Sequence, residues 1–97
     1  MITPNPPQTY FCPPHIRWAY DAACILVVNE QTRQAHMLVA EEAAIWDWLM
    51  LGYSYAQLIQ FIAASSDLPT VQAENHLRQQ LQTWQESGLL QKVAHHG

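Results

Sequence analysis

Apolar and polar residues recur with two different periods along the chain, and the change of period separates strands from helices. Residues 16–20 alternate between large apolar side chains and small or polar ones, as a strand with one buried face does. Residues 24–28 are apolar throughout, which is typical of a central strand. A polar connection of hairpin length then leads to residues 34–39, in which Gln34 and His36 interrupt the apolar character. The pattern predicts a three-stranded meander with residues 34–39 at an edge.

The period then becomes that of amphipathic helices, three times in succession. Residues 41–51 place apolar side chains on one broad face, with two glutamates in the first turn, where a helix N-terminus favours negative charge. Ser54 with Gln57 three residues later has the form of a capping box and begins a second helix. A third helix is expected to start with Thr70 as its N-cap and to end at Gly88. This order of elements predicts an α+β fold, a winged helix-turn-helix with a three-stranded antiparallel sheet followed by three helices.

Chain length and proline content predict one domain with short tails. The 97 residues suffice for a single compact core and leave no room for a second. Residues 1–14 contain five of the six prolines and are predicted to form an extended or partly disordered arm, because proline removes backbone donors and favours extended geometry. Residues 15–91 form the predicted domain, and residues 92–97 a short polar tail.

Charge and hydropathy exclude several classes of partner. Eight acidic residues outnumber four basic ones, so the formal charge of −4 gives no cationic field for nucleic acid. No apolar run approaches the roughly 20 residues of a membrane span, and no secretory signal precedes the domain, so we expect a cytoplasmic protein without a membrane partner. Cys12 and Cys24 are too few for a disulfide framework.

Enzyme motifs are missing from the sequence. The five histidines share no metal-ligand spacing such as HExxH, and neither a G-x-S-x-G elbow nor a glycine-rich phosphate loop occurs among only three glycines. We therefore expect a protein that is not an enzyme, with no cofactor and no metal.

Several apolar residues and glycines, in their order and spacing, carry a resemblance to a known family: Ala43-Ala44-Ile45-Trp46, Leu49, Gly52, Ser54-Tyr55, Leu58-Ile59 and Gly88-Leu89-Leu90. Over about residues 18–90 the chain resembles the PqqD-like family, whose members supply the RiPP recognition element. This winged helix-turn-helix holds the leader of a ribosomally made precursor peptide. The chain differs from the family at Thr32-Arg33, where a hairpin glycine is common, and at Val39, where Asn often precedes the first helix.

The resemblance implies a non-catalytic peptide chaperone that binds the leader and presents it to a modifying enzyme, such as a radical enzyme, a cyclodehydratase or a leader peptidase. The leader would add as a strand to the predicted edge, which neither proline nor lysine blocks, in the cleft beside the third helix. The predicted peptide-binding residues come from the edge strand and the third helix: Gln34, Ala35, His36, Met37, Leu38, Val39, Glu74, Leu77, Arg78 and Leu81.

Two of these residues have equally simple structural interpretations. Arg78 could pair with an acidic leader side chain, or with Glu74 one turn earlier on its own helix. His36 could contact the leader, or it could be a polar residue that a strand edge tolerates.

Two other functions stay open from the sequence. A winged helix could place its third helix in the DNA major groove, although that helix offers only Arg78 as a cation. Alternatively, the domain could be an adaptor or a homodimer that associates through exposed Trp46, Met50 and Phe61. Tryptophans such as Trp46, Trp48 and Trp84 are nevertheless more often core anchors.

Overall fold

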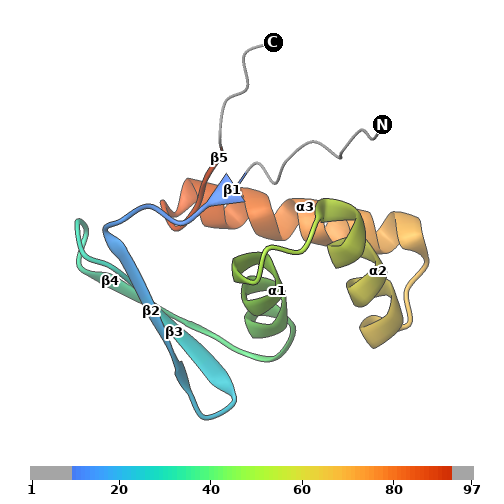
Figure 1. The fold of residues 1–97 in the computed structure, drawn as a ribbon, viewed down its shortest axis with the longest axis horizontal. Coiled ribbons are helices and arrows are strands. Elements are labelled where there is room, and N and C mark those ends of the chain that lie inside the picture. Colours follow the sequence, from blue (N-terminus) through green and yellow to red (C-terminus); the bar gives the residue numbers. More distant parts are fainter. Residues whose placement is uncertain (1–9, 93–97) are drawn as a thin grey trace.

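The sheet has the order that the sequence predicts. In the computed structural model, which describes residues 10–92, β2 (Ile16–Asp21), β3 (Cys24–Asn29) and β4 (Gln34–Leu38) form an antiparallel meander. Their order in the sheet is β2-β3-β4, so β3 is central and β4 is an edge strand, as predicted. Figure 1 shows this sheet on one side of the molecule and the helices on the other.

One face of the sheet is buried and the other is not. Along β3 the buried residues are Ile25, Val27 and Asn29, and they alternate with half-buried residues that face away from the core. Val27 pairs with Trp18 of β2 on one side and with His36 of β4 on the other, so these three side chains share the inner face. The apolar run of β3 therefore reflects its central position, and its outer side chains are only partly covered.

Three helices follow the sheet: α1 (Ala40–Met50), α2 (Tyr55–Ser66) and α3 (Thr70–Glu86). Val39 is the N-cap of α1 and makes no side-chain capping bond. The capping box at the start of α2 is confirmed, because Gln57 N donates to Ser54 Oγ at 3.1 Å and Ser54 N donates to Gln57 Oε1 at 2.8 Å. Gly52 follows the last turn of α1 with a positive φ of 92°, which glycine adopts at little cost.

Replacing Ser54 by alanine is expected to lower the free energy of unfolding by about 1 kcal/mol, because the first turn of α2 loses its side-chain acceptor. Ser65→Ala is the matched control, since Ser65 lies in the last turn of the same helix and makes only a 3.5 Å bond to the Ile62 carbonyl. Urea denaturation of the two variants measures the difference. Equal stabilities would contradict the importance of the capping box.

The start of α3 differs from the prediction. Pro69, with φ −60° and ψ 151°, is the N-cap, and Thr70 is already the first helical residue. The helix begins one residue early because Ala73 N donates to the Pro69 carbonyl at 2.9 Å. The expectation that Thr70 caps the helix is therefore wrong.

Tryptophans connect all the layers of the core. The Trp46 ring of α1 packs edge to face against Trp18 of β2, with centroids 6.2 Å apart, and against Trp84 of α3, with centroids 5.1 Å apart. Trp46 and Trp84 are buried, as expected of core anchors, whereas Trp48 is half-buried against Phe61. A docking patch that includes exposed Trp46 is therefore wrong, because that side chain is fully enclosed.

A short pairing at the ends of the described chain was not predicted. β1 (Tyr10–Phe11) lies antiparallel to β5 (Gln91–Lys92), beyond the buried Leu89 and Leu90 that return to the core. Figure 1 shows this pair beside the C-terminal end of α3. The last residues of the expected arm thus form part of the fold, while residues 1–9 and 93–97 lie outside the described residues.

Candidate functional site

β4 has a free edge, as does β2 at the opposite side of the described sheet. Within residues 10–92 no strand pairs with the edge of β4 that faces away from β3. Gln34, Ala35 and Met37 are exposed along it, and none of its residues is proline or lysine. Such an edge carries a row of unpaired amide and carbonyl groups, so it can accept another strand.

Two contacts near the ends of β4 involve its neighbours in the chain and the sheet, and not β4 itself. At the start of β4, its partner Asn29 lies against Gly88, where a Cβ would come within 3.3 Å of Asn29 Nδ2. At the other end, Glu41 in the first turn of α1 contacts His76 of α3, with Oε1 and Nε2 2.6 Å apart. His76 and Gly88 are roughly 18 Å apart along the helix direction, from a rise of about 1.5 Å per residue. Through these contacts β3 meets the turn after α3, and the start of α1 meets α3 itself.

Asn29 shapes the hairpin that leads into β4. Its side chain is buried, with 3% of the residue exposed, and Oδ1 accepts hydrogen bonds from the backbone amides of Gln31 at 3.0 Å and Thr32 at 3.2 Å. Arg33 then adopts a positive φ of 63°, the conformation for which a hairpin glycine is usual. The asparagine therefore determines the path of the chain where β4 starts. Sequence reasoning assigned it to a polar loop and missed this role.

Glu41 joins three helices at the opposite end of β4. Besides His76, its carboxylate accepts a hydrogen bond from Ser66 Oγ at 2.7 Å, at the end of α2. Both members of the Glu41–His76 pair are partly exposed, so its contribution to stability is small. Its importance is geometric, because it fixes α3 next to the connection between β4 and α1.

The two flanks of α3 have different neighbours. His76 and Gln80, one turn apart, share a flank on which His76 contacts Glu41 of α1. Glu74 and Arg78 lie on the other flank, where their side chains pair at 3.0 Å. The hydroxyl of Tyr55 on α2 and the Glu74 carboxylate raise the pKa of the Arg78 guanidinium. The structure thus shows the intrahelical pairing of Arg78, and it places His76, which was not predicted, against the first turn of α1.

Leu77 and Leu81 belong to the core. Their exposed fractions are 0% and 2%, so neither is presented on an open flank of α3. Both lie in the stripe that packs against the other layers, together with Ala73 and Trp84. Their part as direct leader contacts stays a prediction, and the periodicity of the helix could have indicated the neighbouring positions instead.

The inward side chains of β4 are His36 and Leu38. Leu38 is buried, and His36 is half-buried on the inner face opposite Val27. Across the described part of the chain, His36 Nε2 and Trp46 Nε1 are buried side-chain atoms without a hydrogen-bond partner. Gln34, Ala35, Met37 and Val39 are exposed, so the six predicted edge residues divide between the two faces. As peptide contacts, all six stay a prediction.

Residues 10–92 were compared with two requirements, those of a metal site and those of a membrane-spanning helix. This range contains no group of three or more His, Cys, Asp or Glu side chains that could hold a metal ion. None of its helices is long and apolar enough to cross a membrane.

Comparison with known proteins identifies a fold and no family. No protein-family model and no curated protein matches the sequence. The structure is similar to a solved structure of TbiB1 in complex with the TbiA(beta) leader peptide, with a TM-score of 0.79 at 21% sequence identity. The similarity covers 87% of this chain and 98% of that chain. The fold, three antiparallel strands followed by three helices, is therefore one that is also seen in a leader-peptide complex.

Proposed function

We propose that the protein binds the leader of a ribosomally synthesised precursor peptide, which adds as a strand to the free edge of β4. The observation that carries this proposal is the exposed edge of β4, with which no strand of residues 10–92 pairs. The similarity in fold to TbiB1, whose structure contains a leader peptide, supports it. So does the resemblance of the sequence to the PqqD-like family.

In this proposal backbone hydrogen bonds and side-chain contacts have different roles in recognition. Amide and carbonyl groups of the β4 edge bond to the leader backbone and supply sequence-independent affinity. Alternate leader side chains would point to the inner face, where His36 lies, and we propose that the flank of α3 with His76 and Gln80 faces them. Because this flank is formed by an imidazole and an amide, we expect it to favour polar or hydrogen-bonding leader side chains.

The protein is proposed to be a chaperone for the leader and not a catalyst. It would hold the leader while a separate modifying enzyme, such as a radical enzyme, a cyclodehydratase or a leader peptidase, acts on the rest of the precursor. A strand edge flanked by polar side chains suits this role, because binding leaves most of an extended peptide accessible.

DNA binding is less well supported. α3 offers a single Lys or Arg cation, Arg78, whose guanidinium pairs with Glu74 on the same helix. The protein as a whole carries a formal charge of −4, which repels a polyanion. Absence of retardation of duplex DNA at low salt would agree with this interpretation.

The test is a calorimetric titration of the full-length protein with the leader halves of precursor peptides encoded beside its gene. We expect one of them to bind saturably, and Gln80→Ala to weaken it by about fivefold through the loss of one polar contact on the β4 side. Arg78→Ala is the matched control on the other flank and should change the affinity by less than about twofold. Failure of every such leader to bind would contradict the proposed function.

A further inference from the structure

Two residues of β4 point away from the helices. Ala35 pairs with Val28 and Met37 pairs with Leu26, whereas the inward residue His36 pairs with the buried Val27. Met37 is 49% exposed, a large value for a long apolar side chain in a strand. It stands at the free edge, so a strand added to β4 would lie directly beside it.

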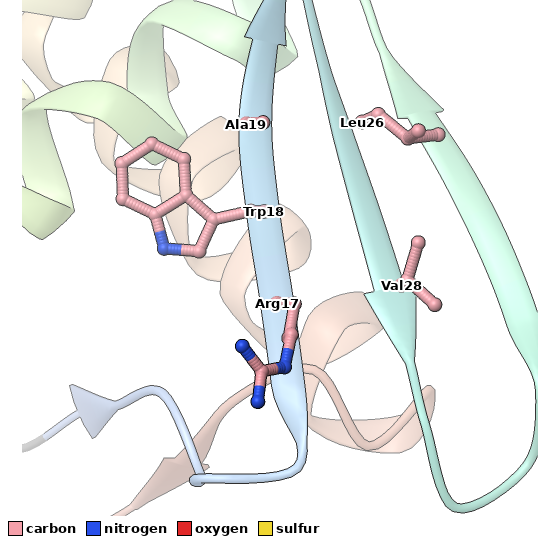
Figure 2. A pocket seen from close by; sticks show the side chains of 5 residues that line it. All are labelled: Arg17, Trp18, Ala19, Leu26 and Val28. Atoms are coloured by element: carbon pink, nitrogen blue, oxygen red, sulfur yellow. The ribbon is translucent and has the colours of Figure 1, made fainter.

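On the outer face of the sheet, the apolar surface extends from the β4 edge across β3 to β2. Leu26 and Val28 of β3 are half-buried, and with Ala19 of β2 they line a shallow hollow of about 290 Å³. Figure 2 shows Leu26 and Val28 along β3, while the Trp18 ring extends to the side of the helices. None of the described helices covers these two side chains, because all three pack on the inner face.

The outward residues of β3 and β4 carry no charge. Arg17 of β2 lies at the border of the hollow, where its Nε is 2.8 Å from Glu30 Oε2. The two outward residues of β4 are uncharged and apolar. A side chain that arrives beside β4 would therefore meet methyl and thioether groups and no charge.

We propose that the bound leader is recognised on this outer face as well as on the inner face of β4, with Met37 as the specificity-determining residue for an apolar leader side chain. The inference rests on the proposed function, since it needs a strand paired with β4. Side chains of an added strand alternate between the faces, and neighbours on one face stand about 5 Å apart. A leucine, isoleucine, valine or aromatic residue beside Met37 would bury both side chains and extend the apolar row formed by Leu26 and Met37.

Methyl NMR provides a direct test, because the chain contains only three methionines. Protein labelled at the methionine methyl groups is titrated with the leader peptide, and backbone amides of β4 are followed in parallel. We expect the Met37 methyl signal to shift with the same saturation curve as the β4 amides. The Met50 signal, from a half-buried side chain on α1, serves as the internal control and should not move.

Two substitutions separate apolar contact from strand pairing. Met37→Thr keeps a residue that favours strands but removes most of the apolar surface, and it should weaken leader binding about three- to fivefold. Met37→Leu keeps the surface and should stay within about twofold of the parent. Threonine substitution of one apolar leader residue should abolish the Met37 methyl shift while the β4 amide shifts persist at higher peptide concentration.

Three results would overturn the inference, and they have different meanings. Shifts of the β4 amides without a shift of the Met37 methyl would refute recognition on the outer face and leave the proposed function intact. A Met37 methyl shift that depends on protein concentration without peptide would show that a second copy covers this face. No shift at β4 with any leader would contradict the proposed function itself, and the inference with it.

Discussion

Replacement of Trp46 by alanine is expected to lower the free energy of unfolding by about 3–5 kcal/mol. Its ring is fully buried and packs edge to face against both Trp18 and Trp84, so it connects the sheet to α1 and α3. A cavity at that point removes contacts from three elements at once. Since small domains have a total stability of about 5–15 kcal/mol, the variant should be largely or partly unfolded at moderate denaturant concentration.

Trp48→Ala is the matched control, two residues away on the same helix. Its ring is half-buried and contacts Phe61, with centroids 5.1 Å apart, at the boundary of α1 and α2. Trp48→Ala should lower the free energy of unfolding by about 1–2 kcal/mol, because a half-buried ring removes less apolar surface from water on folding. Chemical denaturation followed by circular dichroism measures both variants. Equal losses, or a larger loss for Trp48, would contradict the central place of Trp46 in the core.

Asn29→Ala is expected to lower the free energy of unfolding by about 2 kcal/mol. It should also weaken leader binding. The buried amide accepts hydrogen bonds from two loop amides, and the substitution removes both bonds and leaves a small cavity beside Gly88. Because these bonds determine where β4 begins, the strand should become less ordered at Gln34. Amide hydrogen exchange of β4 in the variant measures this loss of order.

Thr32→Ala separates the effect of Asn29 from a general effect of loop substitutions. Thr32 Oγ1 accepts only a long bond of 3.4 Å from Gln34 N at an exposed position. Its removal should change the stability by less than about 0.5 kcal/mol and leave β4 exchange unaltered. If the two variants exchanged β4 amides at the same rate, the buried asparagine would not be what positions the strand.

Local pattern explains why most of the fold could be predicted. Three signals indicate conformations that residues close in sequence determine: the alternation along residues 16–20, the capping box at Ser54 and the glycine at position 88. The pairing of Tyr10–Phe11 with Gln91–Lys92 has no such local signal. It joins segments at opposite ends of the chain, and the prolines around it favour an arm.

The candidate site was predictable in position and not in detail. That β4 is an edge strand follows from a meander of three strands, whatever the packing. Which flank of α3 faces that edge depends on the crossing of three helices, and contacts such as Glu41–His76, which orient α3 against α1, link residues far apart in sequence. Helical periodicity places His76 and Gln80 on one flank and Glu74 and Arg78 on another, but it cannot tell which flank meets the strand.

The burial of Asn29 illustrates the same limit. As a polar residue at the end of an apolar strand, it has the sequence signature of a turn. It is buried because the chain after α3 passes over it at Gly88, a contact between residues that are distant in sequence. Its role in positioning β4 therefore emerges only from the tertiary structure.

The most direct test of strand addition is NMR of the labelled protein bound to an unlabelled leader peptide, with intermolecular nuclear Overhauser effects as the measurement. We expect backbone-to-backbone contacts between the leader and Gln34–Leu38, together with protection of β4 amides from exchange. Leader contacts confined to the exposed side of α1 and α2, with β4 amides unprotected, would contradict strand addition.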